Sequence, residues 1–134
     1  MPTELSKTKN DFIADNFTSS ELWNPDVALR RMGHDSTLLC TLVDYFLEDS
    51  PVLLQQLHDL IHIGDAEESS RLAHNLKGLC ANFEARAAIN VAADTENACR
   101  NGNFPDAIPL FKLLNEEIRK LVPSLTSWQS RHPR

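Results

Sequence analysis

The hydrophobic residues of this chain recur mostly at steps of three, four and seven, a spacing that gathers side chains on one face of an α-helix. The longest such stretch covers residues 35–65. Its apolar stripe consists of Leu39, Leu42, Phe46, Leu53, Leu57 and Leu60. Pro51 lies inside the stretch and predicts a kink or a restart, with Ser50 as a candidate cap. Gly64 is expected to end the helix.

Further helices are predicted on both sides of this stretch. A short helix over residues 24–33 begins at an Asn-Pro pair and ends at a glycine. Asp65 can cap a helix over residues 66–83, and an alanine-rich helix over residues 85–102 follows it. Small alanine side chains let that helix approach its neighbours closely.

A last helix is predicted from near Pro105 to residue 125, with Pro123 expected to weaken its end. Its apolar stripe consists of Phe111, Leu114, Ile118, Leu121 and Leu125. No segment shows the sustained alternation of apolar and polar residues that a β-hairpin needs.

Long helices with short connections predict an all-α fold, an antiparallel up-down-up-down four-helix bundle with a short extra N-terminal helix. We expect a polar tail or linker at residues 1–20, the bundle over residues 22–125, and a C-terminal tail over residues 126–134.

Charge and composition exclude several classes of protein. The chain has 134 residues and a formal net charge of −6. We therefore expect no nucleic-acid partner, because binding phosphates needs a basic face. No apolar run reaches the roughly 18 residues of a membrane span, and the N-terminus lacks the layout of a secretory signal. A cytoplasmic monomer is expected, with Cys40, Cys80 and Cys99 as reduced, buried core thiols.

Residues 71–85 contain a histidine with a lysine three residues later and a glycine four residues later. At about 100° per residue, the half of the helix opposite His74 is apolar. That half carries Leu72, Leu76, Leu79, Cys80 and Phe83. His74 should therefore point to solvent beside the small residues Gly78 and Ala81, joined by Ala85 if the helix runs that far. A mid-helix glycine costs roughly 1 kcal/mol relative to alanine, so Gly78 suggests clearance for another protein.

The chemistry of this face suits a phosphoryl acceptor. A neutral imidazole is a covalent nucleophile, and its ordinary pKa of about 6.5 leaves the neutral form available near pH 7. The ammonium group of Lys77 can offset the negative charge of a bound phosphoryl group. Nothing near His74 in the sequence indicates a general base or an oxyanion hole, so we expect a partner protein to supply the catalysis.

The stretch "AHNLKGLCANFEA" resembles the signature of histidine-containing phosphotransfer (HPt) domains, Ala-His-x-Leu-Lys-Gly followed by small residues. The resemblance extends over roughly residues 22–125. Upstream it includes a Phe, a Pro and a closing Gly-Asp pair, and downstream it includes "TENACRNGNF", where a glutamate precedes a glycine-containing turn. One departure is the pair Glu84-Ala85, where the family commonly has Gly-Ala.

The resemblance implies a bundle that relays phosphoryl groups in bacterial two-component signalling. It implies transfer from a receiver domain of a hybrid histidine kinase to His74, and from His74 to the receiver domain of a response regulator. Lys77 would give electrostatic support, and Gly78 with Ala81 would give docking clearance. No cofactor or metal is expected, and the protein would not be an enzyme in its own right. A free-standing relay protein and the tail of a hybrid kinase both remain open, as does the direction of net flow.

Other interpretations explain fewer of these features. A helical adaptor without phosphotransfer would make His74 incidental, and the His-Lys-Gly spacing argues against that. His58 and His62, with Asp59 beside them, are spaced to chelate zinc, but two ligands are too few and a solvated helix face fits better. No Gly-x-Ser-x-Gly, glycine-rich phosphate loop or His-Glu-x-x-His motif indicates a hydrolase or a kinase.

Overall fold

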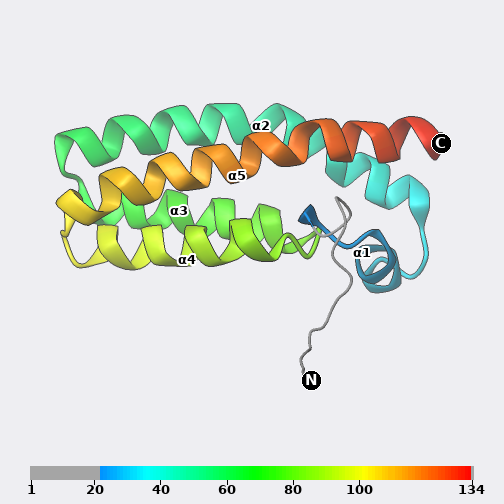
Figure 1. The fold of residues 1–134 in the computed structure, drawn as a ribbon, viewed down its shortest axis with the longest axis horizontal. Helices are drawn as coiled ribbons and strands as arrows, with labels where there is room; N and C mark the ends of the chain where they lie inside the picture. The colour runs from blue at the N-terminus through cyan, green and yellow to red at the C-terminus, as the bar shows by residue number, and fades with distance from the viewer. Residues whose placement is uncertain (1–21, 134) are drawn as a thin grey trace, which may run out of the picture.

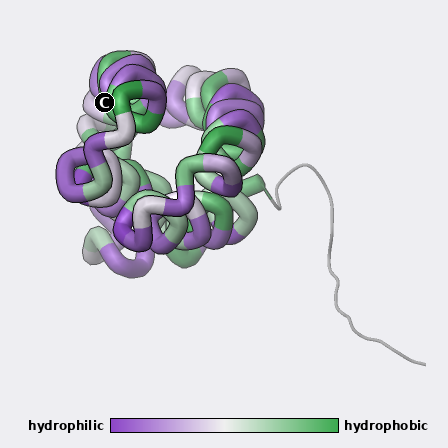
Figure 2. Tube along the Cα trace, turned by 90° about the vertical axis from the view of Figure 1, so that its left-hand side faces the viewer, coloured by the Kyte–Doolittle hydropathy of each residue, from purple (hydrophilic) through white to green (hydrophobic). Residues whose placement is uncertain are grey.

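The structure, a computed structural model, describes residues 22–133. Its helices are α1 (Pro25–Arg31), α2 (Ser36–Ile63), α3 (Ala66–Ala81), α4 (Arg86–Arg100) and α5 (Phe104–Arg131). Helices α2 to α5 lie side by side along one long axis (Figure 1). Seen along that axis, they surround a common centre (Figure 2).

The order of the helices around the bundle follows the chain. Helix α3 packs against α2 and α4, and α5 packs against α4 and α2, so α3 and α5 lie diagonally opposite each other. No strand occurs within residues 22–133. The predicted all-α, antiparallel four-helix bundle with a short extra N-terminal helix is confirmed.

The apolar stripe predicted over residues 35–65 forms part of the core. Leu39, Phe46 and Leu57 are completely buried, and the other members of the stripe pack partly buried against the same cluster. Burial of a large aliphatic or aromatic side chain contributes roughly 1.5–3 kcal/mol each, so this stripe is a main source of stability.

Pro51 and Pro123 do not divide their helices as expected. Helix α2 continues through Pro51, and Ser50 is buried inside the helix rather than capping it. Helix α5 continues through Pro123. Both prolines lie on the exposed side of their helix, where water can hydrate the carbonyl group that each leaves unpaired. Buried residues before and after each proline hold both halves of the helix in the bundle.

The C-terminal tail expected from residue 126 is wrong over residues 126–131, which continue α5. Trp128 is only 4% exposed, because its ring packs edge-on against Trp23 with 5.9 Å between ring centroids. The indole nitrogen of Trp23 donates to Ser124 Oγ at 3.0 Å. Trp23 and α1 thus cover the end where α2 and α5 extend beyond the shorter α3 and α4 (Figure 1). The tail expected at residues 1–20 lies outside the described residues.

Helix α3 ends at Ala81, two residues earlier than predicted. The chain then turns at Glu84, whose φ of 53° is in the left-handed region. Phe83 leaves the helix and is buried between Trp23 and Phe46, with centroid distances of 5.8 and 5.5 Å. Ala85 is also fully buried, so it does not join the exposed face that carries the histidine.

Cys40, Cys80 and Cys99 are buried and free, as predicted. Burial raises the pKa of the Cys80 thiol to about 12, which keeps it protonated and unreactive at neutral pH. None of the described helices is sufficiently long and apolar to cross a membrane.

Truncating Trp128 tests whether the end of α5 belongs to the fold. We expect Trp128→Ala to lower the free energy of unfolding by about 3–5 kcal/mol, because it empties a buried site against Trp23. The measurement is urea unfolding followed by circular dichroism. Thr126→Ala, an exposed change two residues away, should change the free energy of unfolding by no more than about 0.5 kcal/mol. Equal midpoints for the two variants would contradict the packing described.

Candidate functional site

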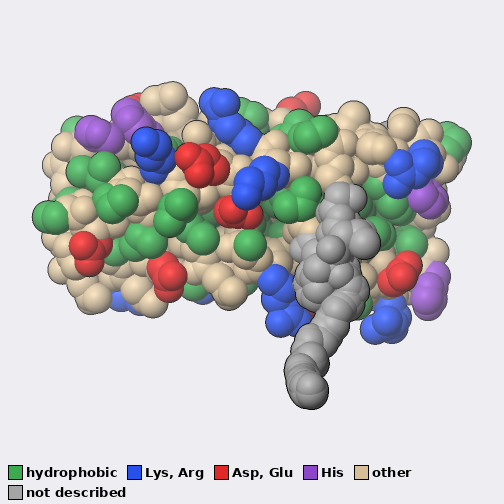
Figure 3. Space-filling view, viewed as in Figure 1, with side chains coloured by type: hydrophobic (Ala, Val, Ile, Leu, Met, Phe, Trp, Pro, Cys, Tyr) green, Lys and Arg blue, Asp and Glu red, His purple; other side chains and the backbone are tan. Residues whose placement is uncertain are grey.

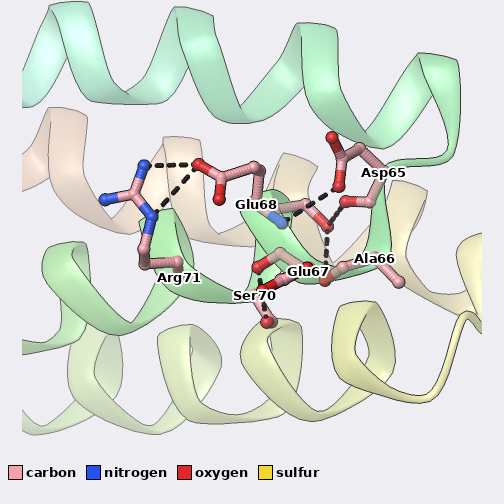
Figure 4. Close-up of polar contacts among 7 residues, drawn as sticks. Asp65, Ala66, Glu67, Glu68, Ser70 and Arg71 are labelled. Atoms are coloured by element: carbon pink, nitrogen blue, oxygen red, sulfur yellow. Dashed lines mark hydrogen bonds and ion pairs between the residues drawn. The ribbon is translucent and has the colours of Figure 1, made fainter.

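Local capping fixes where α3 begins. Gly64 adopts the left-handed conformation at φ 76° and ends α2, and Asp65 then accepts a hydrogen bond from the Glu68 backbone N–H at 3.0 Å. The carboxylate of Glu68 pairs with Arg71 one turn further on (Figure 4). Two turns of helix with a side-chain cap at their start therefore precede His74.

The His74 side chain points away from the core, with 63% of its surface exposed. On the opposite half of α3, Leu72, Leu76 and Cys80 are buried. The orientation predicted from the helical periodicity is therefore the one that the structure has. The imidazole remains accessible to a partner along most of one side.

A buried glutamate from the neighbouring helix lies beneath the imidazole. Glu96 on α4 is 7% exposed, and its Oε2 lies 3.1 Å from His74 Nδ1. The same oxygen accepts from Arg100 Nη2 at 2.5 Å, and Oε1 pairs with Lys77 Nζ at 2.8 Å. One carboxylate thus connects the histidine, the lysine and an arginine from two helices.

The ionisation of Glu96 follows from these contacts. Burial by itself would raise the pKa of this carboxyl group. The hydrogen bond and the charge of Lys77, together with those of His74, outweigh burial and lower the pKa below its ordinary value. Glu96 is therefore a carboxylate at neutral pH, and a carboxylate only accepts hydrogen bonds.

This carboxylate selects one tautomer of the imidazole. Because Glu96 Oε2 cannot donate, Nδ1 of His74 must carry the proton that joins them. In the neutral ring the lone pair is then on Nε2, the nitrogen farther from the helix. The geometry therefore directs a nucleophilic nitrogen toward solvent and holds the ring in one orientation.

Lys77 and Gly78 have different surroundings. Lys77 is 31% exposed, and its ammonium group turns to Glu96 rather than extending freely into solvent. Gly78 is exposed, and apart from its chain neighbours and the adjacent backbone of α3, a Cβ placed there would meet no described atom within 4 Å. No internal contact requires this glycine, so the space above it is open to an approaching molecule. Ala81 is partly buried at the end of α3.

The roles of Glu96 and Arg100 were not predicted from the sequence. No group near His74 was expected to act on the ring, whereas Glu96 contacts it directly. A signal was present in the pattern of α4. Glu96 continues the buried stripe of Ala88 and Ala92 at steps of four, where a charged residue needs partners.

The histidine pair on α2 forms no comparable centre. The rings of His58 and His62 lie 4.1 Å apart, and His58 Nδ1 is 3.3 Å from Asp59 Oδ1. Within residues 22–133, no group of three or more His, Cys, Asp or Glu side chains could hold a metal ion.

Comparison with known proteins agrees with this geometry. The sequence model described as the Hpt domain matches residues 41–123, more than half of the chain. The chain therefore belongs to the Hpt domain family, whose members carry phosphoryl groups in two-component signalling. The resemblance seen in the sequence is thus confirmed.

Two solved structures share the fold. One is histidine-containing phosphotransfer protein B from Pseudomonas aeruginosa PAO1, with a TM-score of 0.76 and 22% identity over 84% of this chain and 97% of the other. The second is the HPT domain of a sensor hybrid histidine kinase from Shewanella, with a TM-score of 0.74 and 17% identity over 85% of this chain and 98% of the other. No match was found among curated protein sequences.

Acid titration tests the buried carboxylate. Since the pKa of Glu96 is lowered on folding, its stabilising contribution should be complete above the ordinary value of 4.5 and fall as the pH drops through the folded value. We expect Glu96→Gln to lower the free energy of unfolding by about 1–3 kcal/mol at pH 7, because donors lose a charged acceptor. That difference should shrink below pH 4.5, the ordinary value.

The measurement is thermal unfolding from pH 3 to pH 8, chosen to bracket the ordinary carboxyl range. Glu67→Gln, an exposed change in the first turn of α3, is the control. If Glu96→Gln lowers the unfolding temperature equally at both ends of this pH range, ionisation of Glu96 does not stabilise the fold.

Proposed function

We propose that His74 is the phosphoryl acceptor of a relay between two receiver domains. In the first step the lone pair of Nε2 attacks the phosphorus atom of an aspartyl phosphate, and the aspartate carboxylate leaves as the oxygen–phosphorus bond breaks. The reverse chemistry passes the group to the aspartate of a second receiver. The observation that carries this proposal is the 3.1 Å contact from Glu96 Oε2 to Nδ1, which leaves Nε2 free.

Glu96 supports the transfer through the ring. As Nε2 forms its bond to phosphorus, positive charge develops on the imidazole, and the carboxylate at Nδ1–H stabilises that charge. Glu96 therefore acts as a positioning residue, since it touches the histidine but not the phosphoryl group.

Two cations balance the charge of the phosphorylated state. Lys77 and Arg100 carry two positive charges against the single negative charge of Glu96. The excess positive charge favours a phosphoryl group, which carries roughly −1.5 to −2 at neutral pH. Lys77 keeps the role of electrostatic support that the sequence suggested, and Arg100 shares it.

The partner supplies the remaining chemistry. No other group within the described residues is in hydrogen-bond contact with the His74 ring besides Glu96. The acidic pocket of a receiver would therefore catalyse both transfers, and this chain would act as a carrier rather than an enzyme. An adaptor role without transfer leaves the network under His74 unexplained. The cytoplasmic location and the monomeric state stay predictions.

Replacing the acceptor gives the first test. A receiver domain labelled with radioactive phosphate on its aspartate should transfer label to the protein, and His74→Gln should receive none. The bond should be labile to acid and stable to alkali, as a phosphoramidate is. His62→Gln removes an exposed histidine from α2 and should accept label normally. Label on the His74→Gln variant would refute the assignment.

A large side chain at Gly78 tests the clearance of the docking face. Gly78→Leu should raise helix stability by about 0.5–1 kcal/mol, since leucine favours the helix more than glycine. It should nevertheless reduce transfer from the same phosphorylated receiver by about tenfold or more, through steric clash with the partner.

The matched control for this change is Thr126→Leu, on the exposed side of α5, diagonally opposite α3. It adds a similar side chain and should leave the transfer rate unchanged. If both variants are folded and transfer at the original rate, Gly78 does not serve as a clearance position.

A further inference from the structure

A single arginine connects the N-terminal helix with the histidine face. Arg31, the last residue of α1, donates from Nη1 to the Ala81 carbonyl oxygen at 3.3 Å. The same nitrogen lies 2.6 Å from Oε2 of Glu84. The Arg31 side chain nevertheless remains 54% exposed, whereas that of Glu84 is 13% exposed. The guanidinium group is therefore held in place and still accessible.

This arginine lies within reach of any protein that docks on His74. Ala81 follows His74 by seven residues, two helical turns or about 10 Å along the axis of α3. A standard protein interface covers about 800 Å² on each partner, equivalent to a disc roughly 30 Å across. A partner centred on His74 would therefore cover the end of α3 and the guanidinium group of Arg31.

The charge at this end of α3 is positive. Glu84 also pairs with Arg86 at 3.3 Å, and the Arg86 side chain is 80% exposed. Two guanidinium groups thus share one carboxylate, which leaves one excess positive charge. This local positive charge is opposite in sign to the net charge of the chain, which is −6. On the face drawn in Figure 3, basic side chains lie among acidic and hydrophobic ones.

We propose that Arg31 and Arg86, held by Glu84, form a second docking contact that binds a carboxylate on the receiver domain and helps to select it. We call Arg31, Glu84 and Arg86 the cationic shelf. The proposal rests on the proposed function, because the partner of the shelf is the receiver that exchanges phosphoryl groups with His74. Arg31 offers its remaining donors in a planar fork that matches a carboxylate. The shelf acts on binding and touches no reacting atom.

The left-handed turn explains why a glutamate is useful here. A non-glycine residue at φ 53° costs on the order of 1 kcal/mol or more, and the two ion pairs of Glu84 offset part of that cost. Glycine would relieve the strain but would leave both guanidinium groups without their anchor. Glu84 thus lowers local stability but keeps the two arginine side chains ordered at the surface.

Steady-state transfer from receiver domains phosphorylated with acetyl phosphate tests this proposal. Arg31→Ala should raise the KM for the best receiver by about fivefold or more and change kcat by less than about twofold, because only docking is weakened. Arg31→Lys keeps the charge but loses the planar fork, so it should recover only part of the loss in KM. Raising the salt concentration should narrow the gap between Arg31→Ala and the original protein.

Arg30→Ala is the matched control, because Arg30 is the preceding residue of α1, is exposed, and has no polar side-chain partner within the described residues. Arg30→Ala removes the same charge and should leave KM within about twofold of the value for the original protein. Equal KM values for the two alanine variants would overturn the proposal, as would a loss in Arg31→Ala that appears in kcat rather than in KM. Failure of the original protein to accept label from any receiver would instead contradict the relay itself.

Discussion

The close packing of α3 against α4 is the constraint on which the candidate site depends. Glu96 can reach His74 only because the two helices approach closely, and each helix buries small side chains. Ala73 on α3 and Ala92 on α4 are completely buried. Larger residues at these positions would separate the helices and move the carboxylate out of hydrogen-bond range. The packing of the fold therefore determines whether the contact between Glu96 and His74 can form.

Burying a carboxylate under a histidine has a cost that other residues must offset. Desolvation alone disfavours the charged form, and the contacts with Lys77 and His74 reverse that preference. Lys77 and Arg100 are the two cations that pair with this carboxylate. The two cations therefore have a double role. In the resting protein they balance the charge of Glu96, and in the proposed phosphorylated state the same charges face the phosphoryl group. This arrangement needs no rearrangement of the helices between the two states.

The sequence was most informative within a single helix. His74, Lys77 and Gly78 lie within five residues, and the periodicity of α3 was enough to show which way the histidine points. The contribution of Glu96 could not be obtained in that way, since it lies 22 residues from His74 and its position depends on the register between two helices. Nor did proline positions predict the helix ends, because tertiary burial carried α2 and α5 past Pro51 and Pro123.

The tautomer of His74 is the most direct test of this account, because it links the buried carboxylate to the reactive nitrogen. Long-range proton–nitrogen correlation spectra of the protein with labelled histidine report which ring nitrogen is protonated in the neutral form. We expect Nδ1 to carry the proton and Nε2 to show the shift of an unprotonated nitrogen. A neutral ring protonated mainly on Nε2 would contradict the account, since the nitrogen facing the partner would then have no free lone pair.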